Sequence, residues 1–207
     1  MLQNRVDPRG DLIKTEARGH WTGNRGVLHD ENKTIRRPFR LKAWITCRLE
    51  FKGRKRSIMA PNRWTELFFL DESTAFAAGH RPCFECRRED ADRFKYFWLR
   101  SNPEYGFHKK TPISEIDEIL HKERIGRDRS KQVFKEDPRR LPDGSFVLVA
   151  QQPFLILRQQ LYPWSPAGYG RPIPLPATDK VTVLTPRSIV NTFSAGYIPQ
   201  MAVPPGR

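Results

Sequence analysis

The fold is most clearly indicated by one stretch of the chain, Leu67-Phe-Phe-Leu-Asp-Glu-Ser-Thr-Ala-Phe-Ala-Ala-Gly-His-Arg-Pro82. Its first four residues are apolar and suit a short buried strand. Asp71 follows as a helix N-cap, and an alanine-rich helix can run through Ala78. Gly79 can then end the helix in the left-handed conformation. The stretch therefore predicts a compact unit of strand, helix and glycine.

The end of the chain repeats this design. The second stretch is Val181-Thr-Val-Leu-Thr-Pro-Arg-Ser-Ile-Val-Asn-Thr-Phe-Ser-Ala-Gly-Tyr-Ile-Pro199, which again predicts a strand, a cap, a helix, Ala-Gly, an aromatic ring and a proline. It is three residues longer than 67–82, close to one helical turn. The two units are either a duplication or a coincidence of common capping rules. The second copy contains no cysteine, so the unit can stand without metal chemistry.

Two longer helices are expected from the spacing of apolar residues. The first covers about 84–100, with the thiols at its start and Phe94, Phe97 and Trp98 on its buried face. The second covers 112–125, where a proline opens the helix and a glycine follows it. Isoleucine and leucine at helical spacing supply its buried stripe.

Short strands are expected over much of the remaining chain. Residues 43–60 alternate like a hairpin, and 146–162 suggest an antiparallel meander. Residues 1–42 carry many turn residues and predict loops and brief strands that add little to the core. Residues 163–178 are too rich in proline and glycine for regular structure.

These elements predict an α+β fold of small antiparallel strands and hairpins, two related strand-helix-Gly units and two longer helices. We expect a basic, thiol-bearing part at 1–126, a charged connection at 127–144 and a small β-rich part at 145–207 that ends in the second unit. A single compact domain is the alternative.

The charge of the chain favours a polyanionic partner. Its 37 Lys and Arg residues exceed its 23 Asp and Glu residues, which gives a formal net charge of +14. Charge of this size attracts nucleic acid, and we expect DNA in particular. No apolar run approaches the ~18 residues that a membrane-spanning helix requires. A cytoplasmic protein with no membrane partner is therefore expected.

Basic residues concentrate in the first 70 residues and after the paired thiols. The alternative to nucleic-acid binding is a merely solvated basic face. Arginine can bind phosphate oxygens in pairs and stack on bases, so such segments suit nucleic acid. The candidate contacts are Arg36, Arg37, Arg40, Lys42, Lys52, Arg54, Lys55, Arg56, Arg87 and Arg88.

The pair Cys83-Phe-Glu-Cys86 is a candidate zinc site. A Cys-x-x-Cys turn lets two thiolates reach one Zn²⁺, but a structural site normally has four ligands. Packed or free thiols without metal, and redox chemistry, are the alternatives. Cys47 is either a third ligand or an ordinary buried residue. His80 is either a further ligand or a packed ring, as Tyr197 at the matching place of the second unit suggests.

The stretch Ser73-Thr-Ala-Phe-Ala-Ala-Gly-His-Arg-Pro-Cys-Phe-Glu-Cys-Arg87 resembles the metal-binding module of Ada-type DNA methylphosphotriester repair proteins. The resemblance covers about residues 67–88 and implies a zinc ion held by cysteines in a domain that contacts DNA. Cys83 and Cys86 match the second cysteine pair of that family. The first pair, which includes the methyl acceptor, has no counterpart here. The resemblance therefore favours DNA maintenance but not methyl transfer.

Two enzyme hypotheses compete with a binding protein. Pro82-Cys-x-x-Cys86 also occurs in zinc-dependent nucleobase deaminases, and His29-Asp30-Glu31 has the form of their His-x-Glu motif. In those enzymes the proline should follow a strand, whereas here the sequence places a helix before it. The polar cluster of Asn24, Arg25, His29 and Asp30 is compatible with a small nuclease-like hydrolase acting on nucleic acid.

Overall fold

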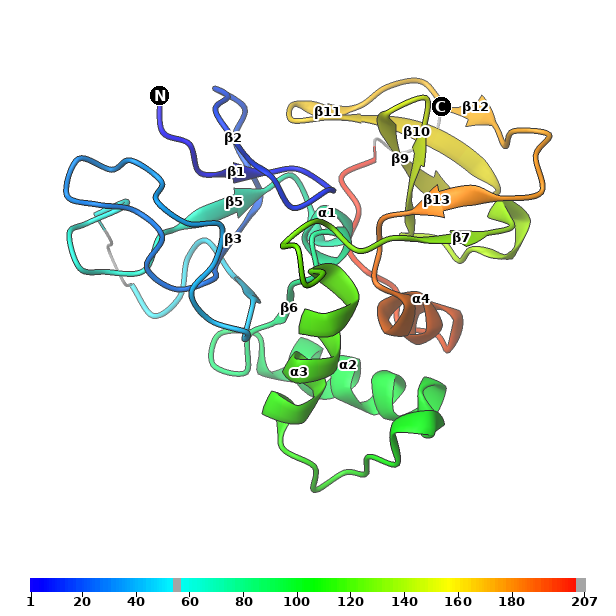
Figure 1. Ribbon diagram of the computed structural model, residues 1–207, viewed down its shortest axis with the longest axis horizontal. Coiled ribbons are helices and arrows are strands. Elements are labelled where there is room, and N and C mark those ends of the chain that lie inside the picture. Colours follow the sequence, from blue (N-terminus) through cyan, green and yellow to red (C-terminus); the bar gives the residue numbers. More distant parts are fainter. Residues whose placement is uncertain (54–56, 204–207) are drawn as a thin grey trace.

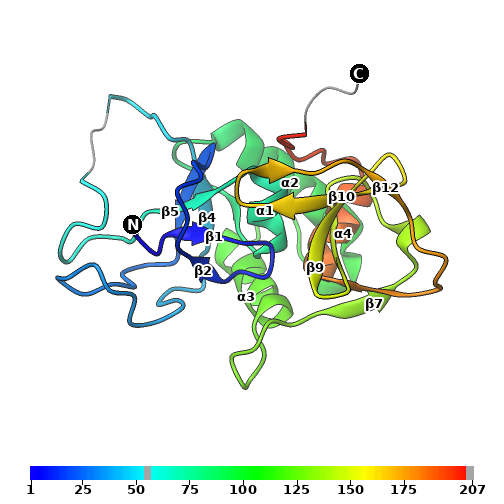
Figure 2. The ribbon, with the colours of Figure 1, turned by 90° about the horizontal axis from the view of Figure 1, so that it is seen from above.

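The computed structural model describes residues 1–53 and 57–203, and it has an α+β fold. Figure 1 shows two sheets on either side of the short helix α1 (Glu72–Ala77), with the longer helices gathered at one end of the molecule. Turning the molecule by 90° keeps α1 between the two sheets (Figure 2). The α+β fold predicted from the sequence is confirmed.

The first sheet contains the strands of the N-terminal part. They are β1 (Arg5–Val6), β2 (Leu12–Ile13), β3 (Trp21–Asn24), β4 (Ile45–Cys47), β5 (Leu67–Phe69) and β6 (Arg81–Pro82). Their order is β2-β1-β5-β3-β4-β6. The pairs β1–β5 and β4–β6 are parallel, and the other pairs are antiparallel. Strand β4 thus lies between β3 and β6 and brings residues from distant parts of the chain together.

The first strand-helix-Gly unit forms as predicted. Asp71 caps α1, because its Oδ1 accepts hydrogen bonds from the backbone N–H of Thr74 at 2.8 Å and from its hydroxyl at 2.6 Å. Gly79 follows the helix with a φ of +88°. A Cβ at Gly79 would lie 2.4 Å from Cδ of Arg124, so only glycine fits there. The unit then continues directly into β6.

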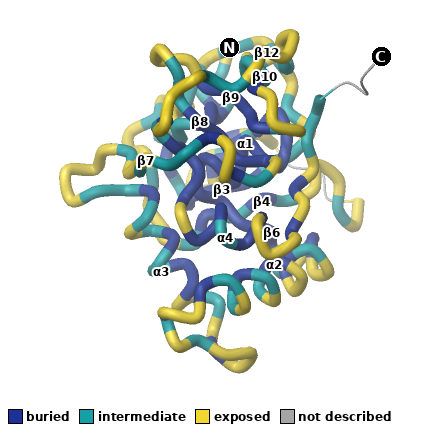
Figure 3. Tube along the Cα trace, turned by 90° about the vertical axis from the view of Figure 1, so that its right-hand side faces the viewer, coloured by how far each residue is buried: buried dark blue, intermediate teal, exposed yellow. Residues whose placement is uncertain are grey.

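The longer helices form a shared core with α1. They are α2 (Arg88–Ser101), α3 (Ile113–Arg124) and α4 (Arg187–Ser194), with short 3-10 turns at Pro103–Tyr105 and Pro138–Arg140. Their buried side chains form one cluster: Phe76, Phe94, Trp98, Ile116, Leu120, Ile189, Phe193 and Tyr197. In Figure 3 this buried interior is continuous with the region around α1. The cluster joins side chains from both halves of the chain.

The second sheet contains the strands of the C-terminal part. They are β7 (Phe134–Glu136), β8 (Phe146–Val149), β9 (Gln152–Leu157), β10 (Gln160–Ser165), β11 (Gly168–Tyr169), β12 (Ile173–Pro174) and β13 (Val181–Val183). The order is β11-β10-β9-β8-β13-β7, and β12 also pairs with β10. The predicted meander is therefore confirmed. Strand β13, α4 and Gly196 form the second unit, in the same element order as the first.

Several sequence predictions differ from the structure. The prediction of a hairpin at 43–60 is wrong. Strand β4 pairs with β3 and β6, and the described residues 57–60 form no returning strand. Residues 1–42 supply three strands and part of the core, through Val6 and Leu28. The short apolar segments around Val6 and Leu28 are buried because they pack against the strand and helix of the first unit.

Three further boundaries also differ. The expected connection at 127–144 contains β7, which pairs with β13, and the proline-rich region 163–178 contains the short strands β11 and β12. The first long helix begins at Arg88 and not near residue 84, because residues 84–86 form the turn that joins β6 to the helix. None of the helices in the described ranges has the length and apolarity needed to cross a membrane.

Candidate metal centre

Three cysteines meet where β4 and β6 end. The Sγ atoms of Cys47, Cys83 and Cys86 all lie within 4.8 Å of one another. Strands β4 and β6 are parallel, with Thr46 opposite Pro82, so Cys47 and Cys83 follow at the same level. The backbone N–H of Cys83 donates to the carbonyl of Thr46 at 2.9 Å and extends this pairing. Sheet register therefore positions the third thiol beside the Cys-x-x-Cys pair.

The Cys-x-x-Cys turn is held by its own backbone. The N–H of Glu85 donates to Sγ of Cys83 at 3.4 Å, and the N–H of Arg87 donates to the carbonyl of Cys83 at 3.0 Å. Amides aimed at sulfur favour the thiolate over the thiol. The turn is thus shaped to present negative sulfur atoms before α2 begins.

The three thiols differ in acidity. Hydrogen bonding from Cys47 is the main effect that lowers the pKa of Cys83 to about 5. Burial raises this pKa, and hydrogen bonds from backbone amides lower it further. The bond from Cys47 also lowers the pKa of Cys86, while hydrogen bonding to Cys83 and Cys86 raises that of Cys47. The Cys47 thiol therefore stays protonated, and the sulfur atoms of Cys83 and Cys86 accept its hydrogen bond. A soft metal ion takes the place of such a proton, because thiolates are its preferred ligands.

Two buried ion pairs fix the turn from outside. Arg87 donates to the carboxylate of Glu72 on α1, and both side chains are almost fully buried. Arg81 makes two hydrogen bonds, at 2.8 and 2.7 Å, to the carboxylate of Asp117 on α3. Arg87 was predicted from the sequence as a nucleic-acid contact. The structure instead places its side chain in the interior, because Glu72 on α1 supplies the opposite charge.

His80 lies outside the thiol cluster. It is fully buried, and its Nε2 accepts a hydrogen bond from Nε of Arg25 at 3.2 Å. Its ring packs against Trp44 and Phe69 at centroid distances of 5.1 and 4.7 Å. Burial, and then the charges of Arg25 and Arg124, lower the pKa of His80. The structure thus places His80 among packed rings and not with the three cysteines.

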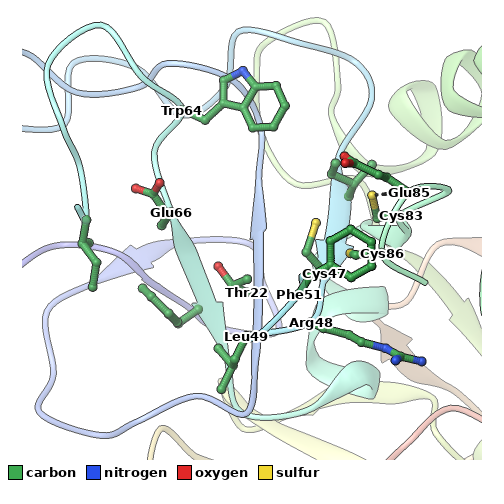
Figure 4. A pocket seen from close by; sticks show the side chains of 13 residues that line it. Thr22, Cys47, Arg48, Leu49, Phe51, Trp64, Glu66, Cys83, Glu85 and Cys86 are labelled. Atoms are coloured by element: carbon green, nitrogen blue, oxygen red, sulfur yellow. Dashed lines mark hydrogen bonds between the residues drawn. The ribbon is translucent and has the colours of Figure 1, made fainter. Parts of the chain in front are cut away.

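An open pocket of about 240 Å³ adjoins the thiols. Figure 4 shows the three cysteines on one side of it and Trp64 and Glu66 on the opposite side. The backbone N–H of Met59 donates to Glu66 at 2.8 Å and holds that carboxylate in place. The three cysteines would supply three ligands to a bound ion, one fewer than a tetrahedral site takes, and the pocket that they line could admit a fourth ligand from outside the protein.

The exposed cations fall into groups with different surroundings. Arg36 pairs with Asp30 at 2.6 Å, Lys42 with Glu118 at 2.7 Å, and Arg88 with Asp92 at 3.1 Å, all at the surface. Among the predicted nucleic-acid contacts in the described ranges, Arg37, Arg40 and Lys52 are exposed and form no ion pair with a described residue. Arg54, Lys55 and Arg56 lie outside the described residues.

The motifs proposed for enzymatic chemistry are not at the centre. The ring of His29 contacts the Thr65 hydroxyl at 2.6 Å and the Ala60 carbonyl at 3.2 Å, and it is not part of the thiol cluster. Asn24 and Arg25 are buried, and Arg25 is bound to His80 and Gly10. A metal centre built on His29 is therefore not supported.

The wall of the pocket was partly visible in the sequence. The alternating face at Ile45, Cys47, Leu49 and Phe51, interpreted as one side of a hairpin, lines the pocket in the structure. Trp64 was missed because it follows a segment of turns and belongs to no periodic element. Comparison of the chain with protein-family models, curated proteins and solved structures finds no match.

Proposed function

We propose that the chain is a nucleic-acid-binding protein, with DNA as the expected partner, built around a zinc-thiolate centre of Cys47, Cys83 and Cys86. The observation that carries the proposal is the meeting of three Sγ atoms within 4.8 Å. Thiolates in a Cys-x-x-Cys turn with a further sulfur ligand favour zinc among the divalent ions.

Charge supports the nucleic-acid part of this proposal. The chain has a formal net charge of +14, and Arg37, Arg40 and Lys52 are exposed. Exposed cations bind the phosphate backbone by releasing its counterions. The likeness of residues 67–88 to the Ada-type module points to DNA maintenance, with Cys47 as a third sulfur ligand in place of that family's first cysteine pair.

The metal part is tested by elemental analysis of protein purified without chelator. We expect stoichiometric zinc in the wild type and a clear loss in Cys47→Ser and in Cys83→Ser. His80→Gln serves as the matched control, because His80 is outside the cluster and this variant should keep its zinc. A wild type without zinc that also fails to bind added Co²⁺ would refute the metal centre.

The nucleic-acid part is tested separately by the salt dependence of binding. Labelled single-stranded DNA, duplex DNA and RNA are titrated at several salt concentrations. We expect affinity to fall steeply with salt, with a slope that counts the phosphates contacted. Affinity that is absent for all three at low salt would refute nucleic-acid binding while leaving the metal result intact.

A second candidate is a zinc-dependent hydrolase acting on a nucleobase. It is favoured by three protein ligands beside an open pocket, as in catalytic zinc sites, and by Glu66 and Glu85 in the pocket wall. Helix α1 precedes Pro82, as predicted from the sequence, but Pro82 itself lies in the short strand β6 directly before Cys83. Ammonia release from single-stranded DNA or RNA, lost in Glu66→Gln or Glu85→Gln with zinc retained, would favour this candidate.

A further inference from the structure

Exposed apolar side chains gather at the mouth of the thiol pocket. Leu49, Ile58 and Trp64 are 50%, 40% and 50% exposed, and all three line the pocket. Single exposed apolar residues are ordinary on a protein surface, but several around one hollow mark a binding site. The pocket is therefore suited to an apolar or aromatic group.

Trp64 presents an aromatic face to that hollow. Within the described part of the chain, its indole takes part in no ring contact and no hydrogen bond. Figure 4 places the ring across the pocket from the thiols. Such rings act as stacking platforms for unpaired bases, and every base has a face that can stack.

The charges of the pocket divide between its inside and its outside. Glu66 lines the wall of the pocket opposite the thiols, so a phosphate group is repelled from the interior. Arg48 also lines the pocket, but its side chain extends away from the thiols in Figure 4. Lys52 and Arg63 are exposed next to the lining residues Phe51 and Trp64. This distribution of charge favours an uncharged ring inside the pocket and phosphate groups at its outer rim.

The size of the pocket limits the occupant. Its volume of about 240 Å³ is below the ~300 Å³ at which drug-sized ligand pockets begin. One base fits this scale better than a base pair. A base inside a duplex cannot reach such a pocket unless it leaves the stack.

We propose that the pocket holds one unstacked base of a single-stranded nucleic acid, with its ring against Trp64 and its phosphates towards Arg48. The inference rests on the proposed nucleic-acid binding and names the form that is bound. It also brings the base beside the open position of the metal centre.

The test compares a single-stranded oligonucleotide of about 12 nucleotides, within the usual range of single-strand sites, with an otherwise identical one that lacks its bases. The full zinc-loaded chain is titrated with each by fluorescence anisotropy. Trp64→Ala should weaken binding of the normal strand by about 5- to 150-fold, the range that loss of one stacked base produces. The base-free strand should bind wild type and Trp64→Ala equally.

Matched variants separate stacking from other effects. Trp64→Phe should restore most of the affinity, and Tyr96→Ala should leave it unchanged, because Tyr96 is 53% exposed on α2 and does not line the pocket. Arg48→Gln should weaken both strands alike and reduce the salt slope, as loss of a phosphate contact does.

The outcomes distinguish the inference from the proposed function. If the wild type binds neither strand and binds no duplex DNA or RNA either, the nucleic-acid proposal fails; if it binds only duplex, the base-pocket inference alone is wrong. If it binds the normal strand and Trp64→Ala binds as tightly, the base-pocket inference alone is wrong. If Trp64→Ala instead abolishes self-association with strand binding unchanged, the pocket is occupied by a second copy of the chain, and the inference is equally overturned.

Discussion

Replacing Arg87 by methionine should destabilise the fold without weakening nucleic-acid binding. Its side chain is 1% exposed and paired with Glu72, and its guanidinium lies 4.0 Å from the ring of Trp21. Breaking a buried ion pair from one side costs about 3 to 5 kcal/mol. Glu72 keeps hydrogen bonds from the Tyr197 hydroxyl and the Gln200 N–H, each at 2.9 Å, which places the expected loss near the lower figure.

The measurement is urea denaturation followed by circular dichroism. With an m-value of about 2 kcal/mol per molar, a loss of about 3 kcal/mol lowers the midpoint by about 1.5 M. Arg88→Met is the matched control: its side chain is 69% exposed and pairs with Asp92, so it should cost less than about 1 kcal/mol. Equal midpoints for the two variants, with affinity for DNA lost only in Arg87→Met, would show that Arg87 acts at the surface after all.

Two further predictions concern stability. Burial, and then repulsion from Arg25 and Arg124, lower the pKa of Lys131 to about 7. The unfolded chain therefore binds more protons above pH 7, so the free energy of unfolding should rise from pH 7 to 9, and Lys131→Met should flatten that rise in urea titrations. Gly79→Ala should cost more than Gly106→Ala by thermal denaturation. Both glycines have positive φ, but only at Gly79 does an added Cβ collide with another side chain; equal losses would contradict this account.

Local capping made the first unit predictable. Asp71 and Gly79 act on residues within one or two helical turns, so the strand, helix and glycine could be placed from their order alone. The second unit and the helix at Ile113–Arg124 have no side-chain cap, but a proline before each helix and apolar residues at helical spacing within it were enough to predict them. In each case, the residues that fix the helix lie inside it or next to its ends.

The pairing of strands that are distant in the sequence could not be predicted from local patterns. Alternation at Ile45 and Cys47 identified a face but not the strands that border it, and the partners proved to be β3 and β6. The charge of Arg87 suggested a surface role, because Glu72 lies 15 residues earlier and meets it only once α1 is packed. The third thiol was ambiguous for the same reason: only sheet register brings Cys47 to Cys83.

The parallel pairing of β4 with β6 also sets the order of events in assembly. Cys83 and Cys86 are neighbours in the chain and can capture an ion early, whereas Cys47 is separated from them by a long segment whose closure costs entropy. A complete set of three ligands for a bound ion would therefore form only after β6 has docked beside β4. A bond made late slows unfolding more than it speeds folding. A bound ion would thus slow the unfolding of the assembled sheet but would not nucleate its folding.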